Sequence, residues 1–139
     1  LAPTGALMTL IALWTGSLWG KPTWGTYWVW DARLTSELIL LFLYLGFMAL
    51  QAAIDDPRRA DRAGAVLALV GVVNIPIIYY SVQWWNTLHQ GASVSVKGSS
   101  MAPVMLWGML VMAAAFWAYS IAAALFRVRC IIREREGIA

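Results

Sequence analysis

Two short segments contain most of the side chains suited to binding a ligand. Residues 24–33 read WGTYWVWDAR, with three tryptophans, one tyrosine, an acid and a base. Residues 79–91 read YYSVQWWNTLHQG and include His89, the only histidine of the chain. Aromatic rings offer flat apolar surfaces with a polar edge, and a neutral imidazole is a common metal ligand. Because the chain has no recognisable nucleophile motif, these residue types predict a binding site rather than a catalytic centre.

The spacing within residues 24–33 places several rings side by side in either of two backbone conformations. In a helix, Trp24 and Trp28 stack at i,i+4, as do Tyr27 and Asp31. In an extended segment, Trp28 and Trp30 share one face. The candidate binding residues of the two segments are Trp24, Tyr27, Trp28, Trp30, Asp31, Arg33, Trp84, Trp85 and His89.

The ligand that suits this surface is large, flat and mostly apolar, with anionic groups for Arg33, Lys21 or an indole N–H. A porphyrin meets this description, and a quinone or a lipid headgroup meets it less well. A lone histidine near a membrane is ordinarily a solvated loop residue, but beside such a surface His89 is a candidate axial ligand to haem iron. One histidine supplies one axial ligand. The second must come from an N-terminal part outside this chain, from a partner or from an acceptor.

Tryptophan and tyrosine also anchor helices at the membrane surface, where an amphipathic ring suits the headgroup region. That role accounts for two or three rings at each helix end. It does not account for their one-sided distribution, since residues 55–62 and 127–139 contain no tryptophan. The one-sided belt favours a ligand over simple anchoring.

The composition predicts a membrane protein. Of 139 residues, 61% are hydrophobic and 12% are charged, whereas soluble domains have about 45–50% and about 25%. A helix of roughly 20 apolar residues crosses a bilayer core. Four stretches qualify, namely residues 1–20, 34–54, 63–82 and 101–126. We therefore expect an all-α, polytopic membrane protein in which four transmembrane helices form a single domain over the whole chain.

The basic residues predict the orientation of these spans. Seven of them lie in the loop 55–62 and the tail 127–139. The other three, Lys21, Arg33 and Lys97, lie in the loops 21–33 and 83–100. Because basic residues concentrate on the cytoplasmic side, both aromatic loops are expected to be external. In a Gram-negative bacterium this puts the site on the periplasmic side of the inner membrane.

Local signals predict the helix ends. Pro22 cannot continue a hydrogen-bond ladder, so the first helix is expected to end at Lys21–Pro22. Asp55, Asp56 and Pro57 are placed to stop one helix and start the next. The chain contains no Gly-rich phosphate loop and no CxxC pair, and nothing in it suggests binding to nucleotides or nucleic acid.

Few polar residues lie inside the spans. Arg33 and Glu37 share one helical face, where they either pair with each other, or Arg33 holds an anionic ligand and Glu37 orients it. Pro76 frees the carbonyl of Val72, and Asn74 is placed to satisfy backbone groups at that kink. Such a break can shape a cavity, but helix packing explains it equally well.

The segment WGTYWVWDARLTSELILLFLY, with GSLWGKP before it, resembles the tryptophan-rich WWD motif of the cytochrome c maturation protein C family (CcmC, haem exporter protein C). The segment GVVNIPIIYYSVQWWNTLHQG resembles a later external loop of the same family. The resemblance covers most of residues 5–95. The positions that match the family pattern are Trp24, Gly25, Trp28, Trp30 and Asp31 in the WWD motif, and His89 as the second of two axial histidines.

The resemblance implies a function in haem handling. Family members have six transmembrane helices, and this chain looks like the last four. They bind haem b transiently at the WWD segment and present it to the haem chaperone CcmE, which attaches it through its own histidine. The ABC transporter subunits CcmA and CcmB and the small protein CcmD assist the release of the loaded chaperone. We therefore expect a haem-binding scaffold in the lipid bilayer, with Arg33 or Lys21 at a propionate and Asp31 orienting the loop or the chaperone's histidine.

Three alternatives fit less well. A haem lyase of the WWD superfamily usually has more helices and a larger external domain than loops of 13 and 18 residues. A quinone-binding membrane-anchor subunit of an oxidoreductase usually places histidines inside its helices, and none of the four spans contains one. A transporter permease needs a charged path across the membrane, which these spans lack.

Overall fold

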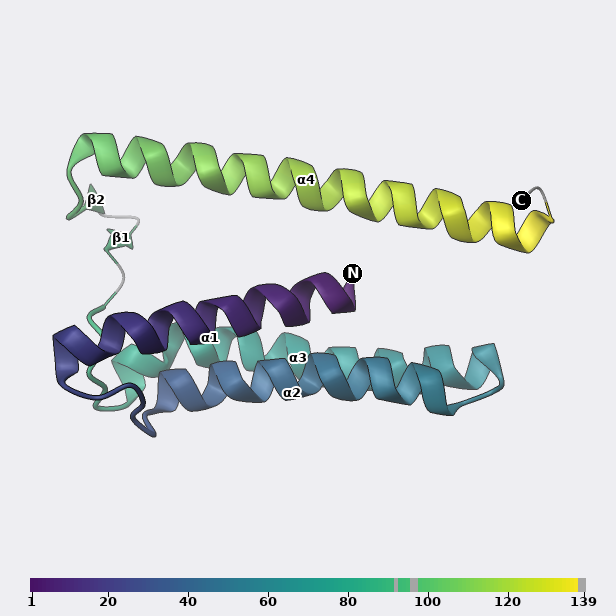
Figure 1. Cartoon of the computed structure of the whole chain (residues 1–139), viewed down its shortest axis with the longest axis horizontal. Coiled ribbons are helices and arrows are strands. Elements are labelled where there is room, and N and C mark those ends of the chain that lie inside the picture. The colour runs from purple at the N-terminus through teal and green to yellow at the C-terminus, as the bar shows by residue number, and fades with distance from the viewer. Residues whose placement is uncertain (92, 96–97, 138–139) are drawn as a thin grey trace. The chain divides into compact units, whose positions relative to one another are not determined.

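The structure is a computed structural model that describes residues 1–91, 93–95 and 98–137, without the side chain of Arg135. Four helices account for most of these residues: α1 (Ala2–Trp24), α2 (Ala32–Ala53), α3 (Pro57–Trp84) and α4 (Pro103–Glu136). The strands β1 (Val94–Ser95) and β2 (Gly98–Ser99) pair antiparallel (Figure 1). The described residues confirm the predicted helical class and add this short β-ladder to it. Lys97, used above for the orientation, lies outside the described residues.

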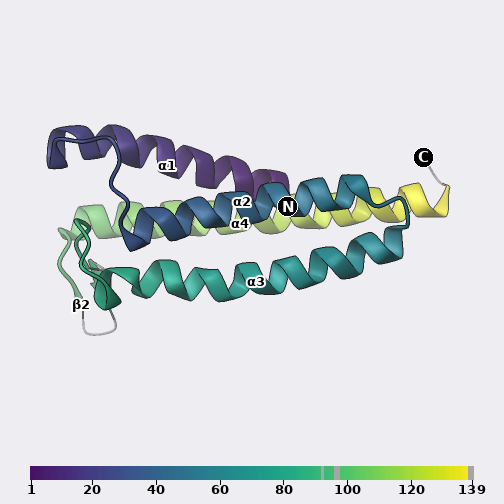
Figure 2. The same ribbon diagram turned by 90° about the horizontal axis from the view of Figure 1, so that it is seen from below.

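Helices α1, α2 and α3 belong to one compact unit, residues 2–91. Helix α2 packs against both α1 and α3, and Figure 2 shows it between them. Successive helices run in opposite directions, so the loop 25–31 and the segment 85–91 lie at the same end of the unit (Figure 1). The turn 54–56 lies at the other end. The two aromatic segments are therefore neighbours in space, as the alternation of the predicted spans requires.

The core of this unit is small. Ala6 and Leu13 of α1 pack with Leu34 and Leu41 of α2, and Trp28 lies against the same cluster. Most other large hydrophobic side chains of the described residues are exposed. An exposed apolar surface of this extent is typical of helices whose outer faces contact lipid, because soluble proteins rarely expose such large apolar patches.

Helices α2, α3 and α4 are long and apolar enough to cross a membrane. Helix α1, which matches the predicted span 1–20, is not among the helices that are both long enough and apolar enough to do so. The prediction of an all-α membrane protein is thus supported, whereas the count of four spans is not confirmed.

Helix α1 does not end at Pro22, as the sequence predicted, but continues to Trp24. Pro22 removes one backbone N–H, yet the helix completes another turn because Gly25 N–H donates to the Lys21 carbonyl at 3.0 Å. The φ of Gly25 is +81°, a left-handed conformation that glycine adopts without strain, and it stops the helix there. The loop before α2 is therefore shorter than predicted, residues 25–31.

The predicted signals at Asp56 and Pro57 do start α3, but the turn is shorter than the predicted 55–62, because residues 57–62 are already helical and only residues 54–56 connect the two helices. Asp56 is the N-cap of α3, and its Oδ1 accepts a hydrogen bond from the backbone N–H of Arg58 at 2.9 Å. Pro57 occupies the first helical position, where its missing N–H is not needed. Helix α3 consequently starts six residues before the predicted span 63–82.

Helix α4 also exceeds its predicted span 101–126, because it continues to Glu136. The predicted tail contains no glycine or proline before Gly137, so nothing interrupts the helix. Gly137 has a φ of +67° and its N–H donates to the Arg133 carbonyl, which ends the helix. Most of the expected tail 127–139 is therefore helical.

Candidate functional site

Asp31 closes the loop 25–31 and forms the N-cap of α2. Its backbone is extended, and its Oδ1 accepts a hydrogen bond from the backbone N–H of Leu34 at 2.8 Å. An aspartate at this position satisfies one free N–H of the first helical turn and favours the positive end of the helix dipole. The local sequence therefore fixes where this carboxylate lies.

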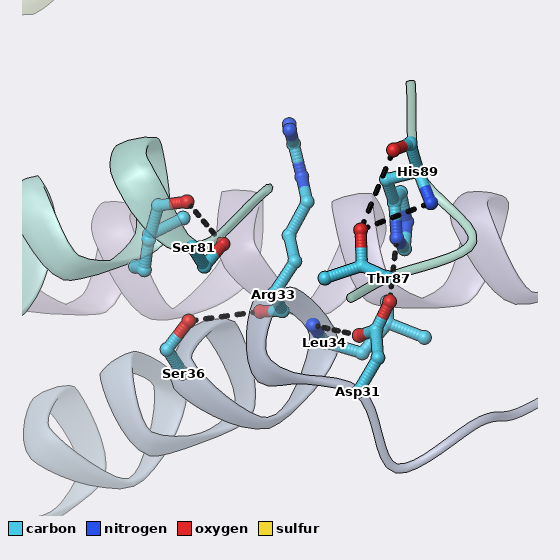
Figure 3. Close-up of polar contacts among 8 residues, drawn as sticks. Asp31, Arg33, Leu34, Ser36, Ser81, Thr87 and His89 are labelled. Atoms are coloured by element: carbon cyan, nitrogen blue, oxygen red, sulfur yellow. Dashed lines mark hydrogen bonds and ion pairs between the residues drawn. The ribbon is translucent and has the colours of Figure 1, made fainter. Parts of the chain in front are cut away.

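The second carboxylate oxygen of Asp31 contacts His89, which lies 58 residues later in the chain. The distance from Asp31 Oδ2 to His89 Nδ1 is 2.8 Å (Figure 3). The side chain of His89 is 18% exposed and that of Asp31 only 5%. Because an ionised carboxylate only accepts hydrogen bonds, Nδ1 is the protonated nitrogen and donates. The Nε2 of the ring forms no hydrogen bond to the residues that the structure describes.

Two further contacts hold His89 in place. The hydroxyl of Thr87 accepts a hydrogen bond from the His89 backbone N–H at 3.2 Å and donates one to its carbonyl at 3.4 Å (Figure 3). The ring of Trp24 meets the imidazole edge-on, with the centroids 4.6 Å apart and the planes at 71°. The imidazole is thus contacted by Asp31 and Trp24, and Thr87 fixes the backbone that carries it.

Trp24 is itself held closely. Its ring lies at 5.3 Å from the ring of Trp19, again in an edge-to-face arrangement. On the neighbouring turn, Gly20 is buried, and a Cβ at that position would lie 3.2 Å from Trp24 Cε3 and 3.3 Å from the Thr26 carbonyl. The absence of a side chain at Gly20 therefore gives Trp24 the room to reach His89.

Trp28 and Trp30 contact each other edge-to-face, with ring centroids 5.5 Å apart. Of the two predicted conformations, the helical one is wrong, because the loop 25–31 is not helical and its rings cannot stack at i,i+4. Trp28 turns toward the core, and its Nε1 is buried with no hydrogen-bond partner in the described residues. Trp30 is 75% exposed. The pair therefore presents one exposed ring and one inward N–H donor beside the site.

The aromatic residues at the end of α3 form a separate cluster. The rings of Tyr80 and Trp84 stack at 5.3 Å with an angle of 15°, and Trp84 meets Trp85 at 5.9 Å. In the described part of the chain, neither tryptophan has a ring contact with the loop 25–31. Of the predicted candidates, Trp24 and Asp31 thus contact His89, Trp28 and Trp30 contact each other, and Trp84 and Trp85 belong to an exposed cluster at the end of α3.

The two basic residues near the site differ in whether their N–H donors already have partners within the protein. Lys21 Nζ donates to the Gly25 carbonyl at 3.0 Å and lies 5.2 Å above the ring of Tyr27. The side chain of Arg33 extends away from the start of α2 (Figure 3). Its guanidinium forms no ion pair, with Glu37 or with any other described residue. Arg33 and Glu37 attract each other at longer range but do not form the direct ion pair that was one of their two predicted roles, so no ion pair occupies the Arg33 donors.

Asn74 has a role that the sequence did not predict. Its Nδ2 donates to the carbonyl of Ser36 at 2.9 Å, and both residues are buried. It therefore joins α3 to the first turns of α2 rather than satisfying the Val72 carbonyl that Pro76 leaves free. The bond lies about one helical turn from the Asp31 cap, so it also fixes the orientation of α2 near the site.

The residues present suit a prosthetic group better than a free metal ion. The described residues contain no cluster of three or more His, Cys, Asp or Glu side chains that could hold an ion. A haem iron has four equatorial nitrogens of its own and needs protein ligands only at its axial positions. The imidazole of His89, with Trp24 as its apolar neighbour, is a candidate for one such ligand.

The fold and the site define a class: a helical membrane protein in which a buried carboxylate holds an imidazole among tryptophans at one end of the helices. A family model described as "Heme exporter protein C" (CcmC) matches residues 1–139. The chain belongs to the CcmC family. This confirms the resemblance that the two aromatic segments indicated.

Curated relatives agree with this assignment. The chain is 65% identical over 116 residues to haem exporter protein C of Bradyrhizobium diazoefficiens, which covers 83% of the chain and 44% of that protein. Identity to haem exporter protein C of Escherichia coli K12 is 69% over 93 residues, covering 67% and 38%. Identity to the Paracoccus denitrificans protein of the same name is 49% over 137 residues, covering 97% and 57%. The chain thus spans about half the length of these relatives.

Proposed function

We propose that this chain binds haem at the periplasmic face of the bacterial inner membrane, with His89 as one axial ligand of the iron. The observation that carries the proposal is the imidazole of His89, held at Nδ1 by Asp31 and flanked by Trp24, with Nε2 free of hydrogen bonds to described residues. The name of these relatives, haem exporter protein C, supports haem as the ligand.

In this proposal each residue has a distinct role toward the cargo. Haem supplies an iron with two axial positions, and His89 Nε2 holds one of them. The second ligand lies outside this chain, in keeping with relatives that are about twice as long. Arg33 binds a propionate, and it is favoured over Lys21 because the Lys21 amine already donates to the Gly25 carbonyl.

The proposed outcome of binding is presentation of haem b to the chaperone CcmE. The chain has no nucleophile motif, so the covalent bond to haem is made by a histidine of CcmE. Tyr27 and Trp30 are more than half exposed beside the site, and they suit contact with a cargo or a chaperone surface. CcmA, CcmB and CcmD are the proposed partners in release of the loaded chaperone.

The proposed topology has four membrane spans in this chain. Helix α1 has 23 residues and a length of about 35 Å, enough to cross a hydrocarbon core of about 30 Å. It carries no charge before Lys21 and packs against α2, which meets the criteria for a span. The basic residues Arg58, Arg59 and Arg62 at the start of α3 support an orientation in which the aromatic end of the α1–α3 unit lies outside the cytoplasm.

Visible absorption spectra test this proposal. Full-length protein in detergent is compared with His89→Ala and with Asn86→Ala, a control at an exposed position of the same segment. We expect an intense haem Soret band in the unmodified protein and in the control, and a lost or shifted band in His89→Ala. An equal haem content and an identical spectrum in His89→Ala would contradict the proposal. Incubation with haem-free CcmE, followed by a haem stain on a denaturing gel, tests presentation separately.

A further inference from the structure

We infer that Asp31 is the positioning residue of the haem site: it fixes the tautomer and direction of His89 without touching the cargo. The inference rests on the proposed haem function and gives Asp31 a role different from those that the sequence suggested. Those roles were to orient the loop or the histidine of a chaperone. The structure instead pairs Asp31 with the histidine of this same chain.

The first argument is that each oxygen of the Asp31 carboxylate has its own partner. Oδ1 accepts from the Leu34 backbone N–H at 2.8 Å, and Oδ2 lies 2.8 Å from His89 Nδ1. Rotation of the carboxylate toward any other group would break the cap of α2. The start of α2 therefore holds the carboxylate through Oδ1, and this leaves Oδ2 directed at the imidazole.

The second argument is burial. With Asp31 5% exposed and His89 18% exposed at the side chain, water has little access to this hydrogen bond. A hydrogen bond to an ionised carboxylate is shorter and stronger than a neutral one, and a protein interior strengthens it further. The bond therefore holds the proton on Nδ1 and leaves the lone pair on Nε2, the nitrogen that a metal requires.

The third argument is chemical. Histidines that bind metals usually donate their other N–H to a carboxylate or carbonyl, which fixes the ring and makes it a stronger ligand. Loss of such an outer partner typically weakens metal binding about 10- to 100-fold. A stronger imidazole donor favours ferric over ferrous haem. We therefore expect Asp31 to lower the reduction potential of the bound iron.

Substitutions at Asp31 separate this role from helix capping. Asparagine and serine are both good N-caps, so Asp31→Asn and Asp31→Ser preserve the start of α2. In Asp31→Asn the amide oxygen takes the cap, and its NH₂ group faces His89 Nδ1. An NH₂ donor there favours the tautomer with the proton on Nε2, so iron binding through Nε2 requires a change of tautomer and is weakened. In Asp31→Ser the side chain is too short to reach the imidazole.

Asp56→Asn is the matched control. Asp56 is also an N-cap, with Oδ1 accepting from the Arg58 backbone N–H at 2.9 Å, but it lies at the opposite end of the α1–α3 unit from His89. This variant shows what the exchange of an N-cap aspartate for asparagine contributes by itself, where no histidine is in contact with the cap.

Three readouts test the inference on full-length protein in detergent. The ¹⁵N shifts of labelled histidine in haem-free protein report the tautomer, which we expect to be Nδ1–H in the unmodified protein and Nε2–H in Asp31→Asn. Titration with haem is expected to show about 10- to 100-fold weaker binding in Asp31→Asn, with Asp31→Ser between the two. Redox titration is expected to show a higher midpoint potential in both variants. If a variant loses ten times more affinity for ferric than for ferrous haem, its midpoint potential rises by about 59 mV.

The outcomes are distinguishable. If His89→Ala loses haem but Asp31→Asn keeps the tautomer, the affinity and the potential of the unmodified protein, the inference is overturned and the haem function stands. If His89→Ala retains haem with an unchanged spectrum, the proposed function fails and the inference fails with it. Equal effects in Asp56→Asn and Asp31→Asn would show that helix capping, not the imidazole contact, is responsible. If Asp31→Asn does not fold, the same three measurements on Asp31→Ser distinguish these outcomes.

Discussion

Asp31 Oδ2 and His89 Nδ1 lie 2.8 Å apart although 58 residues separate them in the sequence. The contact joins the start of α2 to the segment that follows α3. Trp24, at the end of α1, meets the same imidazole. The ends of three helices therefore meet at one ring, and a small change at the end of any of them is expected to affect the proposed haem ligand, His89.

Gly20 provides a test of this convergence from the side of α1. In Gly20→Ala, the new Cβ lies 3.2 Å from Trp24 Cε3 and 3.3 Å from the Thr26 carbonyl. The neighbouring ring and loop must shift by a few tenths of an ångström, which disturbs the Trp24–His89 contact. We expect several-fold weaker haem binding and a shifted Soret band, measured by haem titration.

Gly16→Ala is the control for this substitution. Gly16 lies one turn earlier on α1, and a Cβ there meets no atom within 4 Å. Because alanine favours a helix over glycine by about 1 kcal/mol, this variant is expected to bind haem normally and to be slightly more stable. Identical haem binding by the Gly16 and Gly20 variants would show that Trp24 does not influence the site.

The sequence predicted the elements of the structure better than their ends. Apolar stretches located all four helices, and Asp56 with Pro57 marked the start of α3 because caps depend only on neighbouring residues. The prediction that α1 ends at Pro22 is wrong, because a proline in the last turn destabilises a helix little and Gly25 ends this helix three residues later. The length of α4 was missed because charged residues end a membrane span without ending a helix.

For the site, the sequence named both partners of the central contact but not the contact itself. Asp31 and His89 were each candidates because of their residue types and their aromatic neighbours. Their hydrogen bond depends on how α2 and α3 pack, and no local pattern encodes a pairing across 58 residues. The importance of Gly20 was also missed, because only the packed structure shows which side of a helix a tryptophan occupies.

Gly64 tests the packing that aligns α2 with α3. A Cβ on Gly64 would lie 2.5 Å from Gln51 Nε2 and 2.8 Å from Phe47 Cε2. Gln51 would have to move, and its hydrogen bond to the Ala60 carbonyl, 2.9 Å long, would be lost. We expect Gly64→Ala to lower the free energy of unfolding by about 1–3 kcal/mol, measured by thermal denaturation in detergent.

Gly71→Ala is the matched control on the same helix. A Cβ at Gly71 has no neighbour within 4 Å, so the helix propensity of alanine should leave the stability unchanged or raise it by up to about 1 kcal/mol. Equal midpoints of denaturation for the two variants would mean that α2 and α3 do not approach as closely as the structure has them.

Asn74 tests a polar link between the same two helices. Asn74→Leu removes the donor to the Ser36 carbonyl, a bond of 2.9 Å between buried groups. Interhelical hydrogen bonds in membranes contribute about 0.6 kcal/mol on average, so we expect a small loss of stability. Because the bond lies near the Asp31 cap, haem binding should weaken as well. Ser81→Ala is the comparison, since the Ser81 hydroxyl bonds only within its own helix, to the Ile78 carbonyl.

Arg33 is the proposed partner of a haem propionate, and its role is best tested by changing the ligand and the protein together. The guanidinium has no ion pair among the described residues, so it can form a paired hydrogen bond with a carboxylate. The unmodified protein should bind haem more tightly than haem dimethyl ester, in which both propionates are uncharged.

In Arg33→Ala this preference should fall, because the cation that recognises the propionate is gone. Hydrogen bonds to charged groups contribute about 1.5–3 kcal/mol, which predicts a loss of roughly 10- to 100-fold for haem and little change for the ester. Arg33→Lys should retain part of the preference, since lysine keeps the charge but not the planar pair of donors. Arg62→Ala, near the start of α3 at the opposite end of the unit from His89, should bind both ligands as the unmodified protein does. A preference for haem that persists in full in Arg33→Ala would assign the propionate to another residue.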